Sequence, residues 1–253
     1  MNVIAISNQK GGTAKTTTAA ALAVLLSREG FRVHLVDSDP QASLTTAFGL
    51  TDPKGLLYEA MCRRAALPVT KLGDNLSISP SSIDLSRGET QFIAEAGREY
   101  ILRDCLEETD FGRAATIILD CPPSLGVLSI GCLTAAKYTC VVVQPGGFEL
   151  RTLIHLDETV RMLRERVNPG LSVLGAVLTN CHHRRLTTEE VCREVSKYWP
   201  VLGKVRADAR LLYATTSGKV HYLTHSNALN DYLWLPVTVF VCLLDTVNDC
   251  TPI

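Results

Sequence analysis

Eight consecutive residues, 10–17, combine two lysines, two glycines and three threonines in the order K-G-G-T-A-K-T-T. An apolar run at residues 3–6 precedes them and an Ala- and Leu-rich run follows, which predicts a strand, a turn and a helix. The paired glycines let successive N–H groups point at phosphate oxygens, and the helix N-terminus adds its positive dipole end. Lys15 can then reach the terminal phosphates, and the Thr16 hydroxyl can ligate Mg²⁺. The segment predicts a nucleotide site; the alternative is a Gly-Gly turn with two solvated lysines.

Two further apolar runs end in carboxylates. Residues 32–36 lead into Asp37 and Asp39, and residues 116–119 lead into Asp120. Open α/β sheets place their ligands at the carboxyl ends of parallel strands. Three such strand ends therefore bring lysine, threonine and aspartate side chains to one edge, and the combination predicts a Mg²⁺–nucleotide site.

The spacing of Asp37 and Asp39 sets a geometric condition. Residues two apart in a strand share a face, but this strand is ending, so both carboxylates reach the same site only if the chain leaves extended geometry there. Pro40 favours a turn at this point. The alternative for Asp39 is a capping role for a helix that begins near Gln41.

The three segments together resemble the ParA/Soj branch of the deviant Walker-A ATPases. The resemblance is carried by K-G-G-T-A-K-T-T at 10–17, D-S-D-P-Q at 37–41 and I-I-L-D-C-P-P-S-L-G at 117–126. It continues, more weakly, through V-V-V-Q-P at 141–145, L-G-A-V-L-T-N at 174–180, R-L at 210–211 and S-G-K at 217–219. The likeness covers roughly residues 2–235 and implies a single doubly wound α/β domain that hydrolyses ATP with Mg²⁺.

Family roles transfer onto matching positions. The resemblance implies that Lys15 bridges the β- and γ-phosphates, that Thr17 lies near the α-phosphate and that Asp39 positions the attacking water. The implied catalytic residues are Lys10, Lys15 and Asp39. The implied nucleotide contacts are Gly11, Gly12, Thr13, Ala14, Lys15, Thr16, Thr17, Asn180, Arg206 and Asp208. The last three match positions where relatives hold the adenine base; the alternative for Asn180 is an ordinary turn residue at a strand end. The implied Mg²⁺ residues are Thr16, Asp37 and Asp120.

Two positions in the phosphate-binding segment need separate comment. Lys10 precedes the glycines, and in the resembled family this lysine contacts the nucleotide of the other subunit, which implies an ATP-dependent homodimer; the alternative is a solvated loop lysine. Ala14 stands where the common pattern has glycine. If the backbone has positive φ there, alanine costs roughly 1 kcal/mol relative to glycine, so binding is expected to survive while turnover can change.

The formal net charge of −1 excludes a strong global attraction to nucleic acid, so DNA binding needs a local basic patch. Family members bind DNA non-specifically in their ATP-bound dimer, and a ParB-type centromere-binding partner stimulates hydrolysis. Phosphate contacts of this kind are blind to sequence and sensitive to salt. The alternative for each basic side chain is ordinary solvated surface charge. The candidates are Arg184, Arg185, Lys197, Lys204, Arg206, Arg210 and Lys219.

Length and composition fit one domain in a reducing compartment. A chain of 253 residues is long enough for one large core. Its nine cysteines include no C-x-x-C pair, which indicates a reduced cytoplasmic protein rather than a disulfide framework. The first strand starts almost at the first residue, which leaves no room for a signal peptide. We expect a cytoplasmic protein associated with the nucleoid.

The pattern of apolar runs and turn residues predicts the elements of a mostly parallel sheet with helices on both faces. Expected strands are 2–7, 32–37, 76–80, 116–120, 139–144, 173–179 and 201–205. Expected helices are 15–29, 42–48, 55–63, 84–87, 89–107, 126–136, 150–167, 187–198 and 226–235. The ATPase domain is expected to span residues 1–235.

The C-terminal segment, residues 236–253, departs from the polar helix with which the family usually ends. The run at 232–244 is almost continuously apolar but too short to span a bilayer, and no lysine or arginine follows Lys219. These features favour a core strand or a segment covered by a partner over a lipid anchor, and no membrane binding is expected.

Three alternative functions remain open from sequence. A relative that positions another cargo uses the same chemistry, and a MinD-type regulator of division sites cycles on membranes. An electron-transfer ATPase like the nitrogenase iron protein needs a pair of cysteines at the dimer axis, for which Cys121 and Cys132 are the candidates near the site.

Overall fold

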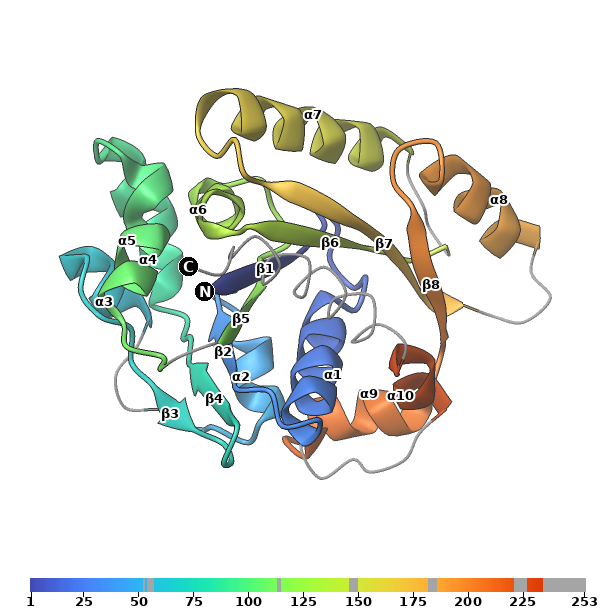
Figure 1. Ribbon diagram of the computed structural model, residues 1–253, viewed down its shortest axis with the longest axis horizontal. Coiled ribbons are helices and arrows are strands. Elements are labelled where there is room, and N and C mark those ends of the chain that lie inside the picture. The colour runs from blue at the N-terminus through green and yellow to red at the C-terminus, as the bar shows by residue number, and fades with distance from the viewer. Residues whose placement is uncertain are drawn as a thin grey trace, which may run out of the picture.

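The computed structural model describes residues 1–51, 53, 57–112, 115–145, 150–181, 186–220 and 227–233. Arg184, Arg185 and the C-terminal segment 236–253 lie outside the described residues, so their expected roles remain predictions. Within the described residues an eight-stranded sheet forms the centre of the fold, as Figure 1 shows.

The sheet has the order β3-β4-β2-β5-β1-β6-β7-β8. Only the short β3 pairs antiparallel among the described strands, so the expectation of a mostly parallel sheet is confirmed. β3 has two residues, too few to give a periodic signal, and it was not predicted. The strands are β1 (Asn2–Ser7), β2 (Val33–Asp37), β3 (Thr70–Lys71), β4 (Leu76–Ser79), β5 (Thr116–Asp120), β6 (Tyr138–Val143), β7 (Ser172–Cys181) and β8 (Val201–Arg206).

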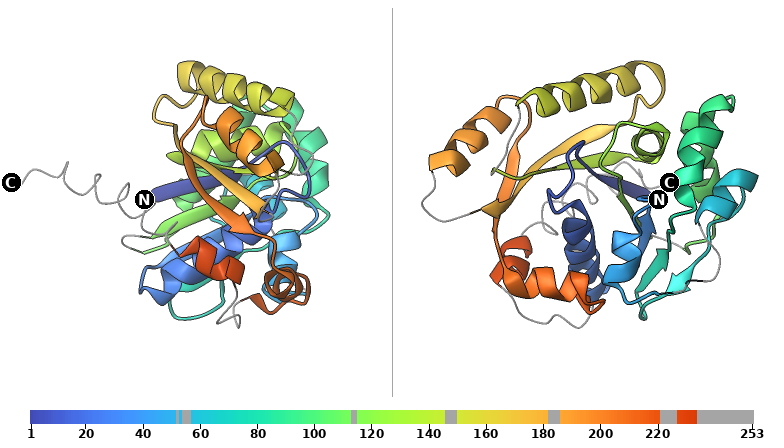
Figure 2. Two further views of the ribbon diagram at one scale, coloured as in Figure 1. Left: turned by 90° about the vertical axis from the view of Figure 1, so that its right-hand side faces the viewer. Right: turned by 180° about the vertical axis from the view of Figure 1, so that it is seen from behind.

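Helices cover both faces of the sheet, as the two turned views of Figure 2 show. α1 (Lys15–Arg28), α2 (Ser43–Ala47), α9 (Ala209–Thr216) and α10 (Asn227–Tyr232) lie on one face. The other face carries α3 (Leu57–Arg63), α4 (Leu85–Gln91), α5 (Ile101–Glu108), α6 (Val127–Ala135), α7 (Leu150–Arg166), α8 (Leu186–Val195), and the 3₁₀ turns η1 (Phe92–Ala94) and η2 (Arg98–Tyr100).

Alternating side chains of each central strand feed two separate cores. In β1, Ile4 and Ile6 join the core under α1, whereas Val3 and Ala5 join the core under α5 and α6. All four side chains are at most 3% exposed. Because both faces are buried, the strand is apolar throughout rather than alternating, and this is why the sequence shows continuous apolar runs.

Two helix predictions need correction. The single helix expected at 89–107 is wrong: it is divided between α4, η1, η2 and α5, because Glu95 is extended and Gly97 has φ of +65°. α9 was not predicted, since its run A-R-L-L-Y-A-T-T is short and ends in β-branched residues that carry little helix signal. It begins where the carboxylate of Asp208 accepts the backbone N–H of Arg210.

Candidate nucleotide-binding site

The loop between β1 and α1 has the shape that a phosphate site needs. Gly12 has φ of +73°, and Ala14, immediately before α1, has φ of 66° and ψ of 32°. Ala14 therefore has the positive φ that was the condition for the expected cost of alanine. Its backbone strain is about 1 kcal/mol relative to glycine. Strain of this kind persists where surrounding contacts hold the chain, and here it lies at the entrance to the helix.

Threonine hydroxyls fix the carbonyl groups of this loop from behind. The hydroxyl of Thr179, in β7, donates to the Thr13 carbonyl at 2.8 Å. The hydroxyl of Thr18 donates to the Ala14 carbonyl at 2.8 Å, and the backbone N–H of Thr18 donates to the same oxygen at 2.9 Å. With their carbonyls held behind, these residues leave backbone N–H groups available to an anion in front.

Lys15 lies inside the curl of the loop. Its ammonium group donates to the carbonyl of Lys10 at 3.0 Å, and the residue is 6% exposed. Burial lowers the pKa of Lys15, while the nearby carboxyls of Asp120 and Asp39 raise it. A buried ammonium group in a loop of this shape is suited to binding a highly charged anion, because the negative charge of the anion compensates the charge of the lysine.

Asp37 and Asp120 face each other as register partners on β2 and β5, and neither is exposed. One oxygen of Asp37 accepts the Thr45 hydroxyl at 2.6 Å and the Thr45 N–H at 2.8 Å. Burial nevertheless raises the pKa of Asp37 to about 6. Burial also raises the pKa of Asp120 well above its usual value, and Asp37 raises it further.

Asp120 differs from its neighbour in its partners. Neither of its buried carboxylate oxygens makes a hydrogen bond of standard geometry among the described residues, but the nearby Thr16 hydroxyl and Lys15 ammonium lower its pKa in opposition to burial. A buried carboxylate in this state is destabilising unless a cation or ordered water satisfies it. The described residues hold no group of three or more His, Cys, Asp or Glu side chains arranged for a metal ion. One carboxylate with a nearby threonine fits Mg²⁺, which takes the rest of its ligands from phosphate and water.

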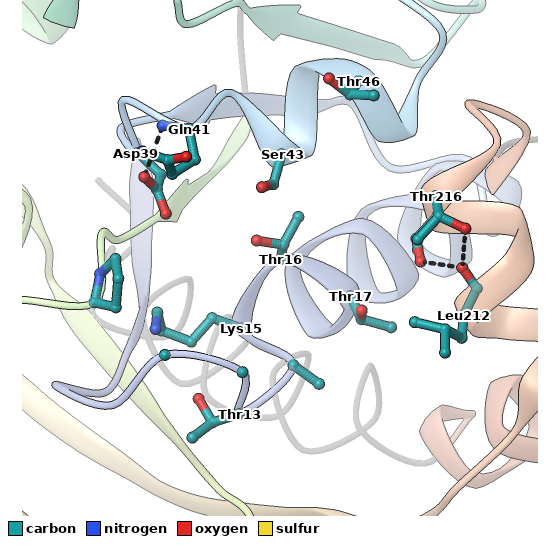
Figure 3. A pocket seen from close by; sticks show the side chains of 15 residues that line it. Thr13, Lys15, Thr16, Thr17, Asp39, Gln41, Ser43, Thr46, Leu212 and Thr216 are labelled. Atoms are coloured by element: carbon teal, nitrogen blue, oxygen red, sulfur yellow. Dashed lines mark hydrogen bonds between the residues drawn. The ribbon is translucent and has the colours of Figure 1, made fainter. Parts of the chain in front are cut away.

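Asp39 has a dual setting. One of its carboxylate oxygens accepts the backbone N–H of Gln41 at 2.9 Å, which is a turn contact. The alternative of a helix cap near Gln41 is wrong, because α2 begins at Ser43 with Ala42 at its N-cap. The residue also lines the cleft, and Figure 3 shows its carboxylate on the wall across from Lys15. β2 ends at Asp37, so the chain leaves extended geometry at the point where the sequence required it. The turn contact and a role in the cleft are compatible.

The cleft in front of the loop has a volume of about 540 Å³ and is drawn in Figure 3. It is bounded by the loop, the β2–α2 segment and α9. Because α9 was not predicted, its contribution to this wall was missed; the only sequence signal there was the R-L pair at 210–211. The lining residues are Gly11, Gly12, Thr13, Ala14, Lys15, Thr16, Thr17, Asp39, Gln41, Ser43, Thr46, Pro123, Leu212, Thr215 and Thr216.

The residues expected to hold the adenine base are not among the described lining of this cleft. Asn180, near the end of β7, has φ of 50°. The guanidinium of Arg206 makes two hydrogen bonds of 2.8 Å to the carboxylate of Asp231 in α10. Asp208 caps α9 and also accepts the backbone N–H of Ala228 at 3.0 Å. The side chains of Arg206 and Asp208 thus join β8, α9 and α10, and base recognition by Asn180, Arg206 and Asp208 stays a prediction.

The basic residues expected to bind DNA have different surroundings. Lys204, Arg210 and Lys219 are exposed. Lys197, which follows α8, makes an ion pair with Glu194 at 2.7 Å, and this pair partly neutralises its charge. Arg206 is paired with Asp231 in the same way. Because a DNA phosphate would have to compete with a carboxylate at both paired positions, the first three residues are the stronger candidates.

None of the helices in the described ranges combines the length and the apolar character that crossing a bilayer demands.

Comparison with known proteins agrees with the geometry. A family model described as an AAA domain matches residues 1–173. The chromosome partitioning protein ParA of Caulobacter vibrioides is 37% identical over 206 residues, which are 79% of this chain and 77% of that protein. The sporulation initiation inhibitor protein Soj of Bacillus subtilis is 36% identical, over 78% and 79% of the two chains.

A solved structure from Mycobacterium smegmatis extends the similarity in three dimensions. It is described as cobyrinic acid a,c-diamide synthase with a bound ATP analogue and magnesium. It superposes with a TM-score of 0.83 at 30% sequence identity and covers 95% of this chain and 94% of its own. The fold around the cleft is therefore one in which a nucleotide and magnesium have been seen together.

Proposed function

The chain belongs to the ParA/Soj family of P-loop ATPases, and from this premise we propose that it is the ATPase of a DNA partition system. In this proposal the ATP-bound protein dimerises and binds DNA without sequence preference. A centromere-bound partner of the ParB type then stimulates hydrolysis and releases the DNA. The relatives named for chromosome partitioning support the biological role.

ATP and Mg²⁺ are the cofactors, and we assign residues of the described part of the chain to each. The loop N–H groups and Lys15 bind the phosphates, and Thr16 with Asp120 holds Mg²⁺, which neutralises charge on the phosphates when bound. Asp39 orients the attacking water from the wall across from Lys15. Asp37 supports the Mg²⁺ shell in this proposal, and its contacts with Thr45 and the Asp39 N–H hold the end of β2 in place.

Lys10 supplies the link between nucleotide and dimer. Its carbonyl accepts the ammonium of Lys15, and its side chain is partly exposed at the edge of the loop. From there its ammonium extends to the nucleotide of a second copy, where it stabilises charge that builds on the transferred phosphoryl group, as an arginine finger does. Two chains joined in this way place their exposed basic residues on one particle, which multiplies the number of phosphate contacts.

The observation that carries the proposal is the buried carboxylate of Asp120, whose oxygens make no hydrogen bond of standard geometry among the described residues and which lies near Thr16 and Lys15, two residues that line the cleft. The test is the steady-state rate of ATP hydrolysis, measured alone, with unrelated duplex DNA, and with DNA plus the product of a neighbouring gene for a basic, centromere-binding protein. A partition ATPase is expected to be slow alone and fastest with both. A hydrolysis rate that changes with neither the DNA nor the centromere-binding protein contradicts the partition role and indicates another cargo.

A further inference from the structure

α10 is connected to the phosphate-binding loop by a chain of hydrogen bonds. The hydroxyl of Tyr232, the last residue of α10, lies 2.9 Å from the hydroxyl of Thr18 in α1. The Thr18 hydroxyl lies 2.8 Å from the carbonyl of Ala14. Tyr232 is 1% exposed and Thr18 is completely buried, so water does not compete for the bond between their hydroxyls.

The direction of each bond follows from the number of protons. A threonine hydroxyl has one proton, and Thr18 donates it to the Ala14 carbonyl, which has none to give. Tyr232 must therefore be the donor to Thr18. A hydroxyl that accepts one bond donates a stronger one, because bonds in a chain polarise one another in a buried environment. Burial also raises the pKa of Tyr232, so the proton that it donates stays in place at working pH.

This series of hydrogen bonds ends at Ala14, the strained residue of the loop. Ala14 has φ of 66°, and its carbonyl accepts both the N–H and the hydroxyl of Thr18. A residue other than glycine holds this conformation only while neighbouring contacts favour it. The Ala14 carbonyl and the N–H of Lys15 belong to the same peptide plane, so holding the carbonyl also fixes the direction of that N–H.

The position of Tyr232 is in turn fixed by the rest of α10. Asp231 binds the guanidinium of Arg206 through two hydrogen bonds, and the N–H of Ala228 donates to Asp208. These contacts attach α10 to the end of β8 and the start of α9. These contacts hold α10, and therefore Tyr232, in place next to Thr18, which lies 214 residues away in sequence.

We propose that Tyr232 is a positioning residue of the nucleotide site, which acts through Thr18 to hold the Ala14 carbonyl and so keeps the loop in its phosphate-binding conformation. The inference rests on the nucleotide site proposed above. It predicts that one hydroxyl far from the cleft controls affinity for ATP, and that its influence depends on the strain at Ala14.

The test is a double-mutant cycle on the full-length chain, with the dissociation constant for ATP and Mg²⁺ measured by calorimetry. Tyr232→Phe keeps the ring and removes the donor, and it is expected to weaken ATP binding about 3- to 10-fold, the value of one hydrogen bond. In an Ala14→Gly background the left-handed conformation is unstrained. There, Tyr232→Phe is expected to weaken ATP binding less than about 2-fold.

Matched controls separate positioning from a general loss of stability. Tyr58→Phe removes a tyrosine hydroxyl that bonds to Gln91 away from the cleft, and it is expected to leave ATP affinity unchanged. Thr18→Val is expected to reproduce the loss, and Thr18→Ser to restore wild-type affinity. Circular dichroism at the assay temperature confirms that each variant is folded.

The outcomes are distinguishable. If the wild type binds no ATP, the proposed nucleotide site itself is wrong. If the wild type binds ATP and Tyr232→Phe binds it equally well, the positioning role is overturned while the site stands. An equal loss in the wild-type and the Ala14→Gly backgrounds also overturns it, because the effect then does not pass through the strained residue.

Discussion

Asp37 and Asp120 lie directly opposite each other on neighbouring parallel strands, and both carboxyl groups are completely buried. Asp37 accepts the hydroxyl and the N–H of Thr45, whereas no hydrogen bond of standard geometry reaches Asp120 from the described residues, although Thr16 and Lys15 nearby favour its charged form. Two buried carboxyls side by side oppose each other's ionisation. The pair is thus an electrostatically unfavourable feature that a bound cation relieves, and stability and function are opposed at this point.

The first prediction concerns the pH dependence of stability without metal. The folded-state pKa of both carboxyls is raised, so the folded protein holds protons that the unfolded chain releases. Their stabilising contribution is present at low pH and is lost as pH rises through the folded pKa, which is about 6 for Asp37. Asp120→Asn removes one ionisation. Between pH 5 and pH 8 the unfolding free energy of the wild type should therefore fall relative to that of this variant, as measured by urea denaturation with EDTA.

The wild type and Asp120→Asn can also be compared in the presence of Mg²⁺. Adding Mg²⁺ and ATP should stabilise the wild type at pH 8 and leave Asp120→Asn much less affected, because the variant lacks the carboxylate that faces the ion. A wild-type stability that does not depend on pH relative to Asp120→Asn contradicts this electrostatic description of the pair.

Replacing Lys15 tests the phosphate-binding loop. Lys15→Ala removes the buried ammonium inside the loop, so ATP binding should become undetectable in calorimetry at concentrations that saturate the wild type. Lys71→Ala, on the exposed edge strand β3, is the matched control and should bind normally. ATP affinity within a few-fold of wild type in Lys15→Ala means that the loop does not bind the phosphates.

Replacing Asp39 separates catalysis from the local turn. Asp39→Ala should bind ATP but hydrolyse it at least 10²-fold more slowly, since water is no longer oriented, and the dimer should accumulate. Asp39→Asn keeps an oxygen for the N–H of Gln41 and should be equally inactive. Normal turnover in either variant assigns Asp39 to the turn alone.

Replacing Lys10 tests the contact between subunits. Lys10→Ala should bind ATP in each monomer but should not dimerise with it, because the proposed contact to the partner's nucleotide is absent. Sedimentation velocity with ATP and Mg²⁺ measures this directly, with Lys71→Ala again as the control. An ATP-dependent dimer of Lys10→Ala rules out the role of Lys10 across the interface.

The fold, and the part of the site formed by the phosphate-binding loop and the aspartates, could be predicted from sequence because buried parallel strands are apolar on both faces. The runs ending at Ser7, Asp37 and Asp120 therefore gave the strand ends directly. The left-handed conformation of Ala14 followed from the position that glycine usually occupies. These signals are local, and the sheet brings them together by a general rule of topology.

The far wall of the cleft could not be predicted in this way. α9 is eight residues long with a weak helix signal, and its contact with α2 depends on a close approach of Gly49 and Gly218, each with positive φ. Nothing in sequence links two glycines so far apart. The bond between Thr18 and Tyr232 is equally long in range, and it depends on α10, whose place is fixed by Arg206 and Asp208.

Replacing basic residues tests which surface meets DNA. Arg210→Ala with Lys219→Ala should weaken binding on all sequences alike and reduce the slope of affinity against salt by up to one unit for each lost contact. Arg63→Ala with Lys71→Ala removes the same charge from exposed positions in α3 and β3, and it should change neither quantity. Equal effects of the two double variants indicate a response to net charge rather than a surface formed by Arg210 and Lys219.

The central claim is that the nucleotide controls the affinity for DNA, and fluorescence anisotropy with two unrelated duplexes tests it most directly. With ATP and Mg²⁺ the protein should bind both duplexes about equally, and the affinity should fall on the order of 10³-fold between 50 and 200 mM salt if about six phosphates are neutralised. ADP should release the DNA. Equal affinity with ADP and ATP, or binding that does not respond to salt, contradicts the account.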